Sequence, residues 1–232
     1  AQITEEEREL LQGRGVDRAL YASGRAFEVD AAKMLEKGKL MSIRPHTRFA
    51  PFPRHSHNYV EIMYMCRGKT VHRIDGDALV TLEAGELLFL NRHASHAIQR
   101  ADAGDIAVNF IVLPQFFDEA FNMAGMDNVL SRFLLGELYT GGAAVSYLHF
   151  RVREVLPVQN LVENMVWTLV NRQPGARRIN QVTMGLLLLQ LMHYTECIDM
   201  SRNGSIRSPM VEAALREIEE NYRAASLTDV AA

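Results

Sequence analysis

The sequence has little cysteine, no long apolar run and no excess of positive charge. Its 232 residues include only two cysteines, Cys66 and Cys197, which lie far apart, so no disulfide framework is expected. The longest apolar run, Met184–Met192, is interrupted by Gln190 and is too short to span a bilayer. The net charge of −3 argues against nucleic acid binding by this portion alone, since that needs a concentrated basic face.

The first residues also lack the features of an export signal. Residues 1–7 are acidic and contain no apolar segment, so we expect no signal peptide. Two free thiols fit a reducing compartment, and we therefore predict a cytoplasmic protein with no membrane partner. The remaining composition, 48% apolar and 23% charged residues, is typical of a globular fold.

Hydrophobic patterning predicts an arm followed by a run of strands. Residues 1–38 form the arm, with short helices that begin after the N-cap residues Thr4 and Asp30. Residues 39–113 contain short strands without intervening helices, which favours an antiparallel sandwich or barrel. Within them, Asp75-Gly76 is the strongest hairpin signal. The expected strands are Leu40–Arg44, Tyr59–Met65, Thr70–Ile74, Ala78–Leu82, Glu86–Leu90, His96–Arg100 and Ile106–Leu113.

Residues 114–200 change to a helical pattern. The predicted helices are Gln115–Leu138 with a break near Gly125, Leu156–Asn171 and Ile179–Ile198. The last helix is apolar on nearly all sides, whereas a surface helix needs only one apolar stripe. Burial of its second face in a homodimer is the simplest explanation, and a central core helix of a larger helical layer is the alternative. The residues expected at the dimer interface are Leu187, Leu188 and Leu191.

The final segment is interpreted as a linker and the start of a further domain. Residues 201–208 are polar, and Pro209 occupies the first position of an amphipathic helix. Residues 226–232 have the pattern of a capped new helix, but a single turn does not repay its nucleation cost. We therefore expect the sequence to be a fragment of a longer protein.

The segment with the most distinctive chemistry is His55–Glu61, together with His96. Residues 55, 57 and 61 differ by even numbers, so on a continuous strand their side chains would share one face. Two imidazoles, a carboxylate and the imidazole of His96 would suit a divalent transition metal. The same groups would also form hydrogen bonds with a polar small molecule. Both interpretations are open at this point.

The same alternation of side chains indicates which further residues face the inside of the predicted barrel. Tyr59 shares the inward parity and is a candidate to give a hydroxyl group to a ligand, while Met63 and Met65 are expected to be core packing. Arg44 and His72 lie on neighbouring predicted strands and are candidates to point inward. Solvated surface is expected for a remaining group of polar residues: His46, His93 and the acidic run Glu5–Glu7.

Two spacings in the strand region resemble the cupin motifs. His55-x-His57-x3-Glu61-x6-Gly68 resembles the first motif, and Gly85-Glu86-x4-Asn91-x-His93-x2-His96 resembles the second. Asn91 and His93 stand where the second pattern prefers Pro and Gly. The resemblance implies a small antiparallel β-barrel of the jelly-roll type. It also places His55, His57, Glu61 and His96 at the four usual metal-ligand positions, for an ion such as Zn, Ni, Mn or Fe.

A second resemblance covers almost the whole chain. The predicted barrel, the long apolar helix and the string from Val211 to Ala231 are together similar to an AraC-type (AraC/XylS) transcription regulator. The resemblance implies an α+β fold in which a cupin-like barrel is followed by a helical dimerisation layer. Residues 209–232 resemble the first helix of a truncated helix-turn-helix domain, so DNA would be bound only through a C-terminal part beyond residue 232.

The function implied by this resemblance is effector sensing and dimerisation, with no catalytic residue. The effector would be a small polar ligand, such as a sugar or sugar derivative. The residues expected to bind it are His55, His57, Tyr59, Glu61, His96 and Arg44. The alternative is a metal-dependent cupin enzyme of the dioxygenase or isomerase type, which would use His55, His57, Glu61 and His96.

Overall fold

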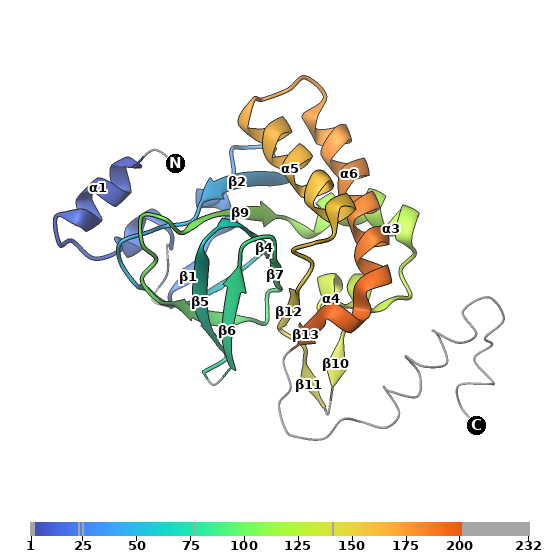
Figure 1. Ribbon diagram of the computed structural model, residues 1–232, viewed down its shortest axis with the longest axis horizontal. Coiled ribbons are helices and arrows are strands. Elements are labelled where there is room, and N and C mark those ends of the chain that lie inside the picture. Colours follow the sequence, from blue (N-terminus) through green and yellow to red (C-terminus); the bar gives the residue numbers. More distant parts are fainter. Residues whose placement is uncertain (1–2, 23, 25, 77, 141, 201–232) are drawn as a thin grey trace. The chain divides into compact units, whose positions relative to one another are not determined.

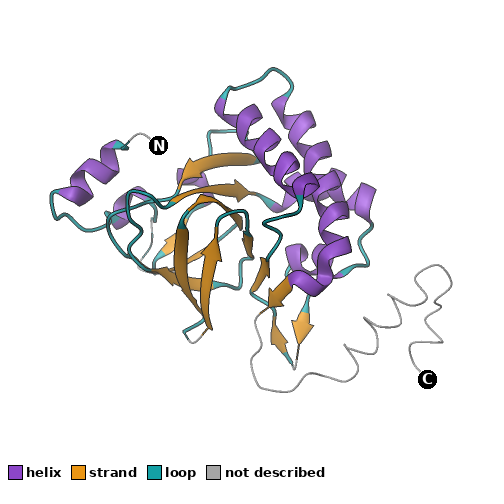
Figure 2. Cartoon of the chain, in the orientation of Figure 1, coloured by secondary structure: helices purple, strands orange, loops and turns teal. Residues whose placement is uncertain are grey.

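The computed structural model describes residues 3–200, apart from 23, 25, 77 and 141. Two β-sheets form a barrel, and helices pack against one of them (Figure 2). The α+β fold with a cupin-like barrel is therefore confirmed. The linker expected over 201–208 and the terminal helix expected over 209–232 lie outside the described residues.

The two sheets are built almost entirely from antiparallel pairs. The first sheet contains, in spatial order, β1 (Glu28–Val29), β3 (Phe52–His57), β8 (Ser95–Ile98), β5 (Lys69–Ile74) and β6 (Ala78–Glu83). The second contains β13 (Ile198–Met200), β12 (Tyr147–Phe150), β7 (Leu87–Leu90), β4 (Val60–Arg67), β9 (Ile106–Val112) and β2 (Met41–Pro45). Separately, β10 (Tyr139–Thr140) and β11 (Ala143–Ala144) pair with each other. The second sheet thus takes two strands from beyond residue 113, the expected limit of the barrel.

Strand β4 is buried on both faces, which explains its nearly continuous apolar sequence. One face points into the barrel and carries Met63 and Met65, as the alternation predicted. The other face packs against the helices through Val60, Ile62 and Tyr64. The strand therefore joins the barrel interior to the helical layer.

The predicted hairpin between β5 and β6 is confirmed. Asp75 and Gly76 lie between the paired residues Ile74 and Ala78, and both have positive φ, 50° and 93°, the turn conformation that an Asp-Gly pair favours. The Asp75 carboxylate also accepts a hydrogen bond from the backbone N–H of Ser95 at 2.9 Å. The turn is therefore tied to the neighbouring strand β8.

The helical layer follows β9. It contains the 3-10 turn Pro114–Phe117, α3 (Asp118–Ala124), α4 (Val129–Leu135), α5 (Leu156–Val170), α6 (Ala176–Leu191) and the 3-10 segment Met192–Cys197. The predicted break lies where expected, because α3 ends at Gly125 with a φ of 81°. Helices α5 and α6 lie side by side, and α3 packs against α6 (Figure 1).

The face of helix α6 that carries its core leucines is buried within its own chain. Leu187, Leu188 and Leu191 are fully buried in the core shared by α3, α5 and the second sheet. These three side chains therefore do not lie on a face that is open to a second copy. The burial corresponds to the alternative interpretation of this helix, a central helix of the chain's own core.

The arm contains α1 (Glu5–Leu11), the 3-10 turn Arg18–Leu20, β1 and α2 (Ala31–Met34). Both predicted N-caps are confirmed. The Thr4 hydroxyl accepts a hydrogen bond from the backbone N–H of Glu7, and the Glu7 carboxylate accepts one from the backbone N–H of Thr4. Asp30 accepts a hydrogen bond from the backbone of Ala32.

Candidate functional site

Three histidines meet inside the barrel on the first sheet. His55 on β3 and His96 on β8 are direct partners in the strand register, and His57 follows His55 on the same face. The ring centroids are 4.3 Å apart for His55 and His96 and 5.0 Å apart for His57 and His96. All three side chains are buried. The alternation of strand β3 therefore produces the predicted histidine cluster.

Glu61 reaches this cluster from the opposite sheet. Strand β3 ends at His57 and β4 begins at Val60, so the chain turns at residues 58–59. Residues 55–61 therefore do not form the continuous strand on which the shared face was conditional, but the three side chains still point inward. The turn carries the chain to the second sheet, where Glu61 again faces inward: its Oε2 lies 3.4 Å from His57 Nε2 and 3.6 Å from His96 Nε2.

Burial determines the protonation of this cluster. Burial lowers the pKa of His55 to about 4, and it lowers the pKa values of His57 and His96 well below 6.5. The same burial raises the pKa of Glu61 to about 7, opposed by a hydrogen bond from the Asn109 amide. At neutral pH the imidazoles are neutral and retain a lone pair for a ligand.

Two buried atoms of the cluster have no hydrogen-bond partner within the described part of the chain, His57 Nδ1 and Glu61 Oε2. An unpaired buried polar atom is costly and calls for a ligand, an ion or water. Glu61 Oε2 is also the oxygen nearest to the histidine pair. The cluster is thus incomplete without an additional group.

The donor atoms have a spacing that suits a metal ion. Ligand atoms about 2.0 Å from a tetrahedral ion lie roughly 3.3 Å from one another. The Nε2 atoms of His57 and His96 are 3.2 Å apart, and their distances to Glu61 Oε2 are similar. One donor nitrogen from each of His55, His57 and His96 lies within 4.8 Å of the other two. These residues would hold a divalent ion, which would supply a positive charge and open positions for a ligand.

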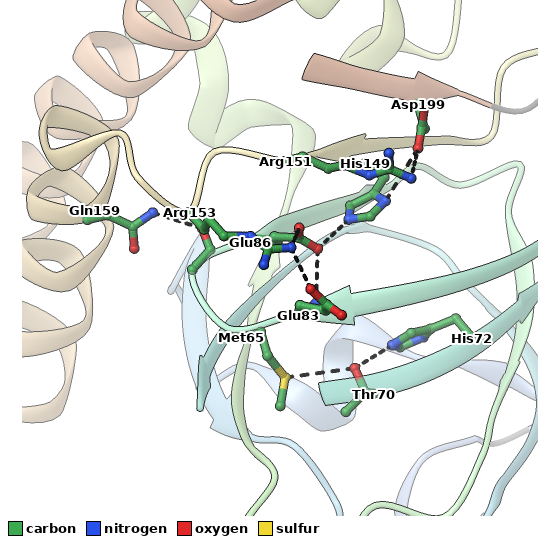
Figure 3. A network of polar contacts seen from close by, with 11 residues as sticks. Met65, Thr70, His72, Glu83, Glu86, His149, Arg151, Arg153, Gln159 and Asp199 are labelled. Carbon is green, nitrogen blue, oxygen red and sulfur yellow. Dashed lines mark hydrogen bonds and ion pairs between the residues drawn. The ribbon is translucent and has the colours of Figure 1, made fainter. Parts of the chain in front are cut away.

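A second layer of polar groups surrounds the cluster. His72 Nδ1 lies 3.4 Å from His96 Nδ1, and His72 Nε2 shares a 2.9 Å hydrogen bond with Thr70 (Figure 3). His46 is also buried, 6.3 Å from the ring of His72, and burial lowers its pKa to about 4. The expectation that His46 is solvated was therefore wrong. Its position depends on the backbone bond from His46 N to Ala107 O, which strand alternation does not reveal.

A cavity of about 50 Å³ opens beside the cluster. This volume holds only a few water molecules. Four of the predicted effector residues line the cavity: Arg44, His55, Tyr59 and Glu61. His57 and His96 lie behind this wall, and their rings contact the lining residues His55 and Tyr59. The structure thus brings all six predicted residues to one place.

The arm closes one side of this cavity. Three arm residues line it: Tyr21, Val29 and Met34. The guanidinium of Arg44 lies 5.5 Å from the ring of Tyr21 and contacts the Met34 sulfur. A ligand larger than the cavity therefore has to displace arm side chains.

The arm is fixed by an ion pair that sequence patterning missed. Glu7 and Arg48 are both buried, and the Arg48 guanidinium donates to both carboxylate oxygens of Glu7, at 2.7 and 2.9 Å. The acidic run Glu5–Glu7 was expected on the solvated surface, which is wrong for Glu7. The sequence feature that could have set Glu7 apart from its neighbours is the capping box with Thr4, which fixes the orientation of the Glu7 side chain.

A further polar network lies outside the lining of the cavity, where the turn between β6 and β7 meets β12, β13 and the segment before α5 (Figure 3). The buried Glu86 carboxylate contacts His149 Nε2 at 2.9 Å and accepts a hydrogen bond from Arg153 at 2.8 Å. Asp199 on β13 pairs with Arg151 at 2.6 Å. This network ties β13, the last described strand, to the sheet.

In the part of the chain that the structure describes, no helix combines the length and apolar character needed to cross a membrane.

Comparisons with known proteins agree with this architecture. Residues 42–121 match the family model of the AraC-like ligand binding domain. No curated protein matches the chain significantly. Among solved structures, an apo variant of ToxT from Vibrio cholerae superposes with a TM-score of 0.52 at 11% identity, covering 84% of this chain and 70% of that chain.

Smaller matches are confined to part of the chain. A cupin protein from Bacteroides fragilis is 28% identical, with a TM-score of 0.27 over 32% of this chain and 64% of that chain. The DMSP lyase DddQ from Ruegeria pomeroyi is 20% identical, with a TM-score of 0.27 over 30% of this chain and 36% of its own. The family match over residues 42–121 covers most of the barrel and most of the residues that line its cavity, so this part of the chain is similar to an AraC-like ligand binding domain.

Proposed function

We propose that this chain is the effector-sensing and dimerisation portion of an AraC-type transcription regulator. The observation that carries the proposal is the buried polar cavity inside a barrel that matches the AraC-like ligand-binding family. Its lining offers a guanidinium, an imidazole, a phenol and a carboxyl group, which suit a small polar ligand such as a sugar or sugar derivative. Residues 114–200 supply the dimerisation region in this proposal, and residues after 208 lead to the DNA-binding part.

In this proposal the first part of the arm, residues 1–30, is the moving part. The cavity is smaller than a sugar, and arm residues form part of its wall, so ligand and the closed arm compete for the same space. A ligand shifts the equilibrium between closed and open arm only by its different affinity for the two states. Effector binding is thereby linked to the position of the arm.

A thermal-shift screen against sugars and related metabolites tests the proposal, because a compound that binds only the folded state raises the melting temperature. The Arg44→Met variant should lose the stabilisation, since Arg44 lines the cavity. The matched control is Arg54→Met on the same barrel: Arg54 is exposed and contacts Ser95, so this variant should keep the response. Stabilisation that survives both Arg44→Met and the cavity-filling change His57→Trp would place the ligand elsewhere.

The second candidate is a metal-dependent cupin enzyme, favoured by the donor spacing of His55, His57, Glu61 and His96. We infer that the cluster serves binding rather than turnover, because the matched family is a ligand-binding domain. Elemental analysis of protein purified without a metal-affinity tag distinguishes the metal-dependent enzyme from the effector sensor. A stoichiometric metal that is lost in a His55→Ala, His96→Ala double variant, with turnover of a substrate, would favour the enzyme.

We further propose that the homodimer forms through the exposed stripe of α6 rather than through its buried leucines. Leu186 is 43% exposed, and Val182 and Leu189, one turn away on either side, are partly exposed. On the neighbouring helix α5, Trp167 and Val170 are also exposed. Sedimentation of the purified chain at micromolar concentration tests for the dimer, and a monomer there would count against it.

A further inference from the structure

A second cavity lies outside the barrel, between strand β2, the segment after helix α2 and the turn from α5 to α6. Its volume is about 380 Å³, compared with about 50 Å³ for the barrel cavity. Sites for small molecules typically measure about 300–1,000 Å³. The outer cavity therefore has the size of a ligand site without any movement of the arm.

Five of the eleven described residues in the walls of this cavity are apolar, and they belong to α2, β2, α5 and α6. Met34 and Met41 are buried, and Ile43, Leu169 and Ala176 are half-buried and complete the apolar surface. Methionine side chains adapt to irregular apolar shapes. These walls suit the hydrocarbon part of a ligand.

The rim of the cavity is charged and has more cations than anions. Lys39 and Arg172 carry positive charges, and Glu36 carries the one negative charge among the lining residues. Arg172 and Glu36 pair at 3.5 Å, but both side chains are largely exposed, so the pair contributes little stability. An incoming anion can replace Glu36 as the partner of Arg172.

Arg172 is held at the rim by an unusual backbone. It follows the end of α5 with a φ of 50°, in the left-handed region that favours glycine. The bond from Gln173 N to Thr168 O closes this helix end in the arrangement that normally has glycine at this place. The chain thus carries a strained arginine where glycine would fold more easily, with its side chain at a cavity.

We propose that the outer cavity binds a small amphipathic monoanion, a carboxylate on an apolar body. The body lies against Met34, Met41 and Leu169, and the carboxylate lies between Lys39 and Arg172. Met34 also lines the barrel cavity, so it separates the two sites. A ligand in the outer cavity therefore contacts the same arm segment that closes the barrel, and the site is additional to the one in the proposed function.

Octanoate is the probe for this site, and octanol is its uncharged control. Calorimetric titration of the chain should show octanoate binding and much weaker octanol binding. Arg172→Gly should weaken octanoate binding about tenfold, the usual size of a lost charge-assisted hydrogen bond. The same variant should raise the melting temperature, because glycine relieves the positive φ. General destabilisation cannot produce this combination.

Three further variants complete the test. Lys39→Glu should weaken octanoate binding, whereas Lys37→Glu, an exposed neighbour outside the lining, should not. Glu36→Gln should strengthen it, because a competing carboxylate is removed. Arg44 lines the barrel cavity and not the outer cavity, although it contacts Met34, so Arg44→Met should weaken octanoate binding far less than Arg172→Gly. Equal binding of octanol, no binding at millimolar octanoate, or loss of binding in Arg44→Met but not in Arg172→Gly would overturn the proposal.

Discussion

Glu7 of helix α1 and Arg48 of the loop after β2 form a buried bidentate ion pair that joins the arm to the barrel. Removal of one partner of a buried pair leaves an uncompensated charge, which typically costs about 3–5 kcal/mol. This pair joins two residues 41 positions apart and anchors helix α1, while strand β1 of the arm is held separately by its pairing with β3.

Glu7→Gln should detach or weaken the arm, because the Arg48 guanidinium loses its charged partner. We expect the free energy of unfolding, measured by urea denaturation, to fall by about 3 kcal/mol. Release of the arm alone would appear as faster hydrogen exchange of residues 5–11, measured by mass spectrometry. The control is Glu5→Gln, whose exposed pair with Arg8 contributes at most about 0.5 kcal/mol. Equal effects of the two variants would contradict an anchoring role for Glu7.

The same pair predicts release of the arm in acid. Burial opposes ionisation of Glu7, but hydrogen bonds from Arg48 and Thr4 and the charge of Arg48 outweigh it, so its pKa lies below 4.5. The stabilisation is complete above pH 4.5 and is lost as the pH falls through the lowered pKa of the folded state. Exchange of the α1 amides, corrected for intrinsic rates, should therefore rise below about pH 4 before the barrel unfolds. Simultaneous opening of α1 and the barrel would argue against a separate arm transition.

Glu61 predicts the opposite pH dependence. Its folded-state pKa of about 7 exceeds 4.5, so its contribution to stability is complete below pH 4.5 and is lost as the pH rises through 7. The loss is on the order of 3 kcal/mol. In EDTA-treated protein, Glu61→Gln should therefore lose less stability than the wild type between pH 5 and pH 8. Glu154→Gln, an exposed control, should follow the wild type.

Zinc should stabilise the wild-type protein more than the Glu61→Gln variant. An ion that binds the folded state stabilises it by mass action, and Glu61 Oε2 is the unpaired oxygen beside the histidines. At pH 7.5 we expect zinc to raise the melting temperature of the wild type more than that of Glu61→Gln. Absence of a zinc effect on either protein would remove the metal interpretation and leave hydrogen bonding to an organic effector.

Neighbouring leucines of α6 should respond differently to a charge. Leu187→Glu places a carboxylate in the fully buried core and should unfold the chain. Leu186→Glu lies on the exposed stripe, so the fold should survive while the proposed dimer dissociates. Circular dichroism and sedimentation measure the two outcomes. A folded dimer of Leu186→Glu at micromolar concentration would exclude this stripe as the interface.

Two glycines with positive φ should differ strongly in their tolerance of alanine. A Cβ at Gly85 would lie 2.8 Å from the Cα atom of Arg153, whereas a Cβ at Gly76 would meet nothing within 4 Å. Gly76→Ala should therefore cost only the left-handed conformation, about 1–2 kcal/mol. Gly85→Ala should cost clearly more, because backbone has to move. Denaturation midpoints of the two variants give the comparison, and similar losses would contradict the crowding at Gly85.

Local signals in the sequence predicted much of the barrel. Turn signals and short apolar segments located β4, β5 and β9, Asp75-Gly76 located a hairpin, and Thr4 and Asp30 located two helix starts, because each depends on neighbouring residues. Strand β12 was missed, since its four buried residues acquire strand character by pairing with β7, about 60 residues earlier.

The residues that were wrongly expected on the surface are buried by residues far away in the sequence. The burial of Glu7 depends on Arg48, and that of His46 depends on the chain crossing the end of the barrel near His72. An apolar helix such as α6 has the same sequence pattern whether its second face meets its own chain or another copy. The candidate site was found because the turn after His57 preserved the inward parity of Glu61.

The division of the site between two sheets has a mechanical consequence. His57 belongs to the first sheet and Glu61 to the second, so any ion or ligand that joins them fixes the spacing between the two sheets. Cores are close-packed and resist compression, so a change in that spacing is passed on to the outer strands. Strand β13 lies at one edge of the second sheet, directly before the segment that begins at residue 201. We therefore expect occupancy inside the barrel to change the position of β13, the last described strand of this sheet.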